Sequence, residues 1–278
     1  MASEDTGAMF EITFKGLRAR YRTWAEGHPL VLLHSGGSSS EQWERFAKAA
    51  PMQWRLIAPD LIGFGGTERW PHAGTLTHDL QAELVAEIIG ATTDSPVDVV
   101  GHSYGGATAL RLAIEHPRKV RSLVLIEPVT TCLLGEAGDP LFAESRVIAQ
   151  TFISSIEKGR PEVGWEAFID SRSGPGTWSS LSDERQRQFL VQSEQTRDAF
   201  VSNLNNRTTL AECASLVLPV TMVIGSNTTA CDRRTSEAVR DAIQTATHAV
   251  IPGAGHMSPL THPRDVVAIV RDHLQNVR

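Results

Sequence analysis

Cysteine, tyrosine and long apolar runs are scarce in this chain of 278 residues. The three cysteines are odd in number and not closely spaced, a pattern that gives neither a disulfide framework nor a metal site. No segment approaches the ~18 apolar residues of a membrane span. A net charge of −6 argues against nucleic acid or an anionic membrane as the main partner. Residues 1–9 lack the basic and apolar regions of a signal peptide. We therefore expect a cytoplasmic protein that acts on a small molecule.

Alternation of apolar runs with helical patterns is the main feature of the first half of the chain. It resumes near the end, and strands that alternate with helices predict a largely parallel sheet. The runs that predict strands are Phe10–Phe14, Leu17–Trp24, Leu30–Leu33, Trp54–Ala58, Val97–Val100, Val120–Ile126, Val220–Ile224 and His248–Ile251. In such sheets ligands bind beyond the carboxyl ends of the strands, so the loops that follow these strands are candidates for a site.

The alternation stops between Cys132 and Leu210, where only helical patterns occur. They cover Leu141–Glu157, Glu162–Asp170 and Asp183–Val201. We interpret residues 132–210 as a helical insertion laid over the strand ends, and residues 1–131 and 211–278 as the core.

Ser103 lies at the centre of a G-x-S-x-G pattern between an apolar strand and a helix-like run. This context is typical of a nucleophile elbow, in which a tight turn projects the serine hydroxyl away from the sheet. Glycine at positions 101 and 105 avoids a collision between a Cβ atom and the neighbouring element. The first N–H groups of the following helix are free to stabilise an oxyanion above the serine.

Four motifs in order resemble the α/β-hydrolase superfamily over most of the chain. They are His34-Ser35-Gly36-Gly37, Pro59-Asp60-Leu61-Ile62-Gly63-Phe64-Gly65, Gly101-His102-Ser103-Tyr104-Gly105-Gly106 and Pro252-Gly253-Ala254-Gly255-His256. The resemblance implies an α/β fold with a mostly parallel, eight-stranded sheet flanked by helices. It also implies a helical lid after the sixth strand, at the place of the insertion.

His256 is the candidate base for Ser103, because it follows the last strand in a glycine-rich loop, where this fold carries its base. The resemblance assigns the oxyanion hole to the backbone N–H groups of Tyr104 and of the early loop, where Gly36 is the candidate donor. We expect His34 to support that loop and His102 to pack beneath the elbow.

The acid departs from the usual pattern of the superfamily, which places an aspartate three residues after the glycine that ends the seventh strand. That glycine is Gly225, and position 228 is a threonine. Two carboxylates remain candidates: Glu127, at the end of the sixth strand, and Asp232, which looks like the cap of the next helix. We favour Glu127.

The resemblance implies hydrolysis through an acyl-enzyme, without a metal or a cofactor. A carboxylic ester or a lactone of a small, apolar molecule is the first candidate substrate, as in a carboxylesterase. Cleavage of a carbon–carbon bond in a diketone-type substrate is the enzymatic alternative, and a receptor-like binding protein is the third. Among the aromatic residues of the insertion, Trp178 is a candidate for substrate contact. The oligomeric state stays open.

Overall fold

A computed structural model of the protein describes residues 7–70 and 75–277. The polar residues 1–6, on which part of the signal-peptide argument rests, lie outside this range. Eight strands form one sheet in the order β1-β2-β4-β3-β5-β6-β7-β8. The strands are β1 (Ala8–Phe14), β2 (Leu17–Trp24), β3 (His28–Leu33), β4 (Trp54–Pro59), β5 (Val97–His102), β6 (Val120–Ile126), β7 (Val220–Gly225) and β8 (Ala246–Ile251).

The burial of each strand explains its sequence pattern. β5, β6 and β7 are covered on both faces and read as near-continuous apolar runs, as parallel strands between two helix layers do. β2 pairs antiparallel with both neighbours and alternates buried and exposed residues, because one of its faces is less covered. The six strands β3 to β8 are parallel, so their carboxyl ends meet at one edge. The predicted fold class is confirmed.

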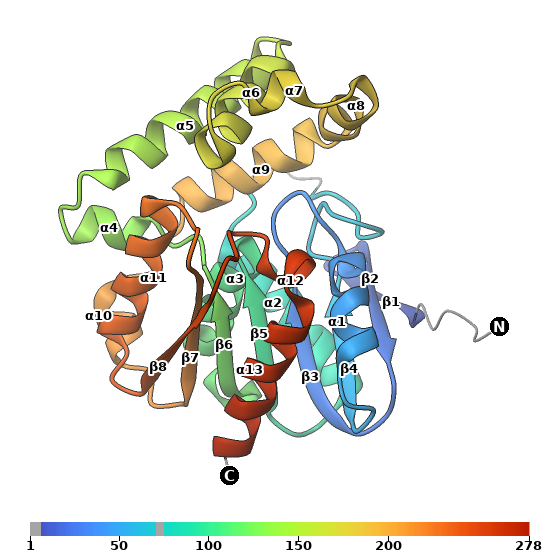
Figure 1. The fold of residues 1–278 in the computed structure, drawn as a ribbon. Helices are drawn as coiled ribbons and strands as arrows, with labels where there is room; N and C mark the ends of the chain where they lie inside the picture. The colour runs from blue at the N-terminus through green and yellow to red at the C-terminus, as the bar shows by residue number, and fades with distance from the viewer. Residues whose placement is uncertain (1–6, 71–74, 278) are drawn as a thin grey trace.

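Helices cover both faces of the sheet, and each face has its own apolar core (Figure 1). α2 (His78–Thr92) and α3 (Tyr104–Glu115) pack on one face. α1 (Glu44–Ala49) and α13 (Pro263–Asn276) pack on the other through Phe46 and Val266. None of the helices in the described ranges is long and apolar enough to cross a membrane.

The segment between β6 and β7 is helical in the described structure, and we call it the insertion. It contains α4 (Cys132–Glu136), α5 (Leu141–Glu157), α6 (Pro161–Ser173), α7 (Thr177–Ser180), α8 (Asp183–Val191), α9 (Ser193–Leu204) and α10 (Leu210–Ala214). α5 to α9 lie above the sheet edge at which the parallel strands end (Figure 1). The division into a core and a lid domain stays a prediction.

The helical pattern over Asp183–Val201 forms two helices, because the chain turns at Gln192 between α8 and α9. A straight helix would separate Phe189 and Phe200 by about 16 Å along its axis. The turn instead brings both rings to one apolar cluster of the insertion, where Phe189 contacts Trp165. Phe200 packs 4.7 Å from the Phe152 ring in the same cluster.

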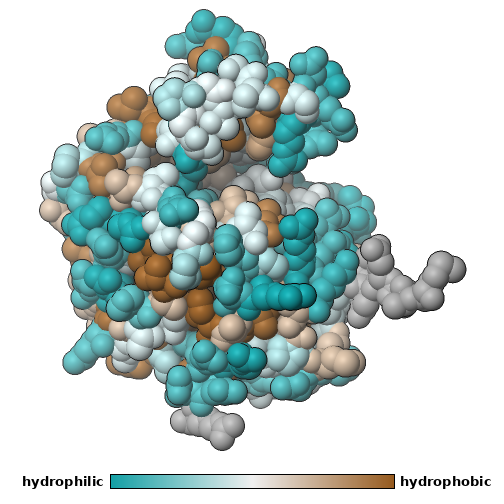
Figure 2. Space-filling view, in the orientation of Figure 1, coloured by the Kyte–Doolittle hydropathy of each residue, from teal (hydrophilic) through white to brown (hydrophobic). Residues whose placement is uncertain are grey.

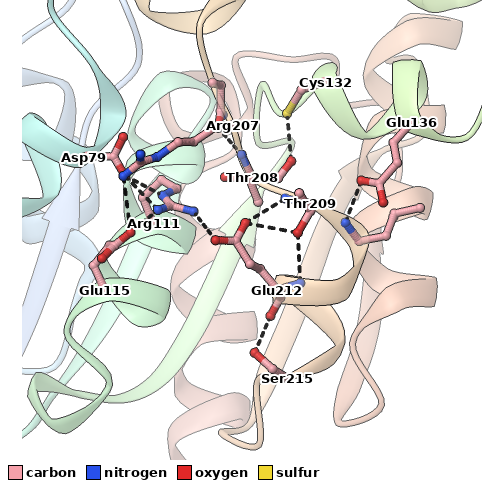
Figure 3. A network of polar contacts seen from close by, with 12 residues as sticks. Asp79, Arg111, Glu115, Cys132, Glu136, Arg207, Thr208, Thr209, Glu212 and Ser215 are labelled. Atoms are coloured by element: carbon pink, nitrogen blue, oxygen red, sulfur yellow. Dashed lines mark hydrogen bonds and ion pairs between the residues drawn. The ribbon is translucent and has the colours of Figure 1, made fainter.

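A buried arginine ties the end of the insertion to the core (Figure 3). Arg111 on α3 is only 1% exposed. Its guanidinium donates to Asp79 on α2 and to Glu212 on α10, each over 3.0 Å, and also pairs with Glu115. Because a buried charge is costly unless it is paired, these contacts fix the position of α10 against α2 and α3.

Candidate active site

Ser103 occupies a strained turn between β5 and α3. Its φ of 55° is in the left-handed region, which residues other than glycine rarely adopt. A Cβ atom on Gly101 would lie 2.5 Å from the carbonyl oxygen of Gly105, and one on Gly105 would lie 2.4 Å from that of Leu33. The two glycines are therefore needed for the close approach of strand and helix that forms the elbow.

His256 follows β8 and faces the Ser103 hydroxyl. The hydroxyl donates to Nε2 of His256 over 2.9 Å, and Nδ1–H donates to Oε2 of Glu127 over 2.8 Å. His102 supports the loop from below, because its Nε2–H donates over 2.8 Å to the backbone carbonyl of His256. Burial, together with the neighbouring His256, lowers the pKa of His102 well below its usual value. His102 therefore acts as a neutral donor.

Glu127 is held by three donors at the end of β6. The carboxylate is buried and accepts from His256, from the backbone N–H of Gly225 over 2.8 Å and from the hydroxyl of Thr228 over 2.7 Å. The Glu127 backbone is itself in the left-handed region, with a φ of 43°. Thr228 is a residue that the sequence analysis missed as a functional partner. Thr228 occupies the position where the superfamily usually has its aspartate. Its hydroxyl donates to Glu127, which reaches the same place from the end of β6.

Asp232 lies near the imidazole but outside hydrogen-bond distance. Its Oδ2 is 3.7 Å from Nδ1 of His256 and pairs with the guanidinium of Arg172 on α6. Burial opposes the charged form, but Arg172, His256 and the Thr229 hydroxyl together hold the pKa of Asp232 below its usual value. The expectation that Asp232 caps the next helix is wrong. Thr229 caps α11 (Ala230–Ala242), because its hydroxyl accepts from the backbone N–H of Asp232.

Glu127, Asp232 and His256 each bring one possible metal-ligand atom within 4.8 Å of the others. The guanidinium of Arg172 already lies against Asp232 and would repel a cation there. A mechanism without a metal or a cofactor stays our prediction.

Tyr104 and Gly36 carry the two backbone N–H groups that we predict for the oxyanion hole. Tyr104 is the first residue of α3, where a backbone N–H has no partner within the helix. The Cβ position of Gly36 is 3.6 Å from that of Tyr104, so the early loop runs beside the elbow. The N–H of Ser35 already donates to Gln42 over 3.0 Å, which favours Gly36 as the second donor.

His34 and Asp60 fix the loops on that side of the site. Nδ1–H of His34 donates to the carbonyl of Ser35 over 2.7 Å, and its Nε2 accepts from the N–H of Leu61. Burial lowers the pKa of His34, which keeps the ring neutral. Asp60 accepts from the backbone N–H groups of Ser40 and Gly66. His34 thus supports the early loop, as expected, and Asp60 holds the two loops around it.

A cavity of about 290 Å³ lies between the insertion and the strand ends. Ser103 is not among its lining residues, and the cavity approaches the triad through Asp232, whose Oδ2 is 3.7 Å from Nδ1 of His256. Apolar side chains dominate its lining, among them Ile148, Phe168 and Phe200. A second, polar hollow borders the Gly37 loop and Gln192, and Figure 2 shows the surface hollowed between insertion and core.

Trp178 packs inside the insertion against Phe189 and is 6% exposed. It is not among the residues that line the cavity. Its contact with substrate stays a prediction, to which the packing adds no support.

The hydroxyl, imidazole and carboxylate thus form one hydrogen-bonded chain at the edge of a parallel sheet. Such a chain can activate a serine as a nucleophile. The family model described as "Alpha/beta hydrolase family" matches residues 30–269. The chain belongs to the alpha/beta hydrolase family.

Several relatives of the chain are named as hydrolases. The chain is 30% identical over 279 residues to a 2-hydroxymuconate semialdehyde hydrolase of a Pseudomonas species, across 95% of this chain and 93% of that protein. It is 26% identical over 264 residues to the 2-hydroxy-6-oxo-6-(2'-aminophenyl)hexa-2,4-dienoic acid hydrolase of Metapseudomonas resinovorans, across 90% and 85% of the two chains. An alpha/beta hydrolase from a deep-sea metagenome shares the fold with a TM-score of 0.79 at 16% identity, across 96% and 97% of the two chains.

Proposed function

We propose that this alpha/beta hydrolase is a serine hydrolase in which Ser103 is the nucleophile, His256 the base and Glu127 the acid. The observation that carries the proposal is the continuous hydrogen-bonded chain, with 2.9 Å from Ser103 to His256 and 2.8 Å from His256 to Glu127. These distances are within the range that proton transfer requires. The carboxylate accepts from Nδ1–H, which leaves Nε2 unprotonated and able to receive the serine proton.

In the proposed reaction, Ser103 attacks a substrate carbonyl as His256 takes the hydroxyl proton. The N–H groups of Gly36 and Tyr104 stabilise the oxyanion, an interaction in which one donor is worth ~3–4 kcal/mol of activation energy. The tetrahedral intermediate collapses, the leaving group takes the bonding electron pair, and His256 gives it the proton. Water, deprotonated by the same imidazole, then hydrolyses the acyl-enzyme and regenerates the serine.

We further propose that the bond cleaved is a carbon–carbon bond of a diketone-type substrate. Similarity over nearly the full length to a 2-hydroxymuconate semialdehyde hydrolase supports this alternative over the ester cleavage that the sequence analysis placed first. A carbon leaving group departs with its electron pair only when a second carbonyl stabilises the resulting carbanion as an enolate. The substrate must therefore carry a second carbonyl that is conjugated, directly or through double bonds, with the carbanion that cleavage leaves. The products are a carboxylic acid and an enol or ketone.

The cavity lined by Arg172 and Asp232, on the acid side of the triad, supports a small substrate with an apolar part. Its volume of about 290 Å³ is just below the ~300–1,000 Å³ typical of ligand pockets, which fits a small substrate. Phe168 and Phe200 supply aromatic surface for that part of the substrate.

A substrate screen tests the proposal. Wild-type enzyme and Ser103→Ala are compared on a vinylogous diketone and on matched carboxylic esters and lactones. Ser95→Ala is the control, since this exposed serine precedes β5 at the far end of the sheet. We expect turnover of the diketone by wild type and by Ser95→Ala, and its loss in Ser103→Ala. Turnover of esters alone would refute carbon–carbon cleavage and return ester hydrolysis to first place.

A serine-reactive fluorophosphonate separates an enzyme from a receptor-like protein. Labelling of Ser103 is expected, and absence of labelling at every pH would refute the serine hydrolase. Labelling without turnover of any of these substrates would favour a binding protein that keeps a reactive serine.

A further inference from the structure

Arg172 connects the insertion to the acid side of the candidate active site. It lies on α6, stacks on the Phe168 ring at 5.5 Å and pairs with Asp232 in the core. The side chain of Asp232 is 7% exposed, and that of Arg172 is 24% exposed. The positive charge of the guanidinium therefore balances the negative charge of a carboxylate that is almost inaccessible to water.

The titratable and charged groups near His256 are the neutral His102 at the end of β5, Glu127 after β6 and Asp232 on α11, which pairs with Arg172 on α6. Glu144 on α5 lines the cavity together with Arg172. Two of these carboxylates lie at the same imidazole nitrogen, Nδ1, at 2.8 Å and 3.7 Å. Only one acceptor can orient a single N–H, so the second carboxylate is a competitor.

We propose that Arg172 is a positioning residue of the active site, which neutralises Asp232 and keeps this second carboxylate from competing for His256. The inference rests on the proposed function, since it concerns the base of the same triad. Glu127, which carries no such cation partner in the contacts described here, then alone accepts Nδ1–H and aligns Nε2 with the serine.

The sign of the electrostatic effect follows from the geometry. Without Arg172, the negative charge of Asp232 stands uncompensated 3.7 Å from the ring and stabilises the imidazolium. An imidazolium cannot take the proton of Ser103, so the nucleophile is lost at a higher pH than in the wild type. Without Asp232, the uncompensated guanidinium acts in the opposite direction and disfavours the imidazolium.

The position of Arg172 links this balance to the insertion. The ion pair joins α6 to α11, so it exists only while the insertion lies over the strand ends. The position of the insertion that encloses the cavity is therefore also the one in which Arg172 neutralises Asp232 beside His256.

The pH dependence of Ser103 labelling tests the proposal without a known substrate. The rate of labelling by a fluorophosphonate is measured from pH 5 to 9 in wild type, Arg172→Gln, Asp232→Asn and the double variant. An opposite charge within ~4–6 Å shifts a titration by ~1–3 units. The acidic limb is the pH range in which the labelling rate falls as the pH is lowered. We expect this limb to move up by about one pH unit or more in Arg172→Gln and down in Asp232→Asn. In the double variant, which removes both charges, the limb returns close to its wild-type position.

Arg146→Gln is the matched control, because this arginine is also on the insertion, stacks on Phe142 and is exposed. It should leave the limb in place. If Arg172→Gln does not fold, as judged by circular dichroism, Arg172→Lys and Asp232→Asn decide the matter. The lysine variant keeps the wild-type limb, and the asparagine variant still moves it down.

Two failures are distinguishable. A wild-type protein whose Ser103 is never labelled refutes the proposed function itself. Normal labelling of wild type with limbs that coincide in all variants, or a double variant that stays shifted like Arg172→Gln, refutes the role of Arg172 and leaves the serine hydrolase intact.

Discussion

Replacing His78 with glutamine should make the stability of this protein less sensitive to acid. His78 begins α2 and is 2% exposed, between the core and the insertion. Its ring contacts the hydroxyl of Thr108 on α3 over 3.0 Å and the side-chain oxygen of Asn203 on α9 over 2.9 Å. Burial is the main reason that the pKa of His78 is lowered from 6.5 to about 4.

The sign and the size of the effect follow from linkage between protonation and folding. The unfolded chain binds a proton at His78 more readily than the folded chain does, so acid favours unfolding. The contribution of His78 to stability is complete above about pH 6.5, falls as the pH drops and is lost below about pH 4. One pH unit in this window is worth about 1.4 kcal/mol, so the fall from pH 6.5 to pH 5 costs about 2 kcal/mol.

Urea unfolding followed by tryptophan fluorescence at pH 7.5 and pH 5 measures this difference. The free energy of unfolding of wild type should fall by about 2 kcal/mol more than that of His78→Gln between the two pH values. Variants at the exposed His248 serve as the control, because that ring lies in water in both states. Equal losses in wild type and His78→Gln would contradict the reasoning, since the other buried histidines are common to both proteins.

Three further predictions concern the site and the fold. Glu127→Gln should lower kcat by ~10⁴-fold, as loss of a triad acid does, and Asp232→Asn far less. Steady-state kinetics would contradict our assignment if the order were reversed. Arg111→Met should lower the free energy of unfolding by about 3 kcal/mol, because three carboxylates lose their shared cation; an unchanged urea midpoint would refute this. Gly105→Ala should abolish Ser103 labelling, because its Cβ would lie 2.4 Å from the carbonyl oxygen of Leu33.

Local pattern was sufficient to predict the sheet and the positions of Ser103, at the turn after β5, and of His256, in the loop after β8. Each of these depends on a short segment whose meaning is set by its neighbours: an apolar strand, a glycine-rich loop, the start of a helix. The prediction of Glu127 used one step more, since it required the absence of a carboxylate at position 228. The structure then places Glu127 in contact with His256, and Asp232 beyond hydrogen-bond distance.

Contacts between distant segments were not predictable in the same way. Arg172 and Asp232 are 60 residues apart, and no periodicity relates them. The packing of Trp178 within the insertion depends on the turn at Gln192, which interrupts a pattern that reads as one helix. Thr228 did carry a signal, because a hydroxyl where an aspartate is usual can donate to an acid on the next strand. The sequence predicted that His102 packs beneath the elbow, but its hydrogen bond to the backbone carbonyl of His256 became visible only in the structure.

The acid reaches His256 from β6 because β6 and β7 are adjacent and parallel. Ile126 pairs with Val223, so Glu127 emerges one strand away from the loop after Gly225. Strands are spaced ~4.8 Å apart, a gap that the longer side chain of glutamate crosses to meet the Gly225 N–H and the Thr228 hydroxyl.

A carboxylate placed at position 228, after β7, should therefore replace one removed from position 127, after β6. The Thr228 hydroxyl and Nδ1 of His256 contact the same oxygen of Glu127, over 2.7 Å and 2.8 Å, so position 228 lies within reach of the imidazole. Glu127→Ala should lose most of the Ser103 labelling rate, and the added change Thr228→Asp should recover a large part of it. Thr228→Asp alone would bring two carboxylates together and should not exceed wild type. A folded double variant as slow as Glu127→Ala would show that the strand of origin, and not only the place of the carboxylate, determines the activity of this triad.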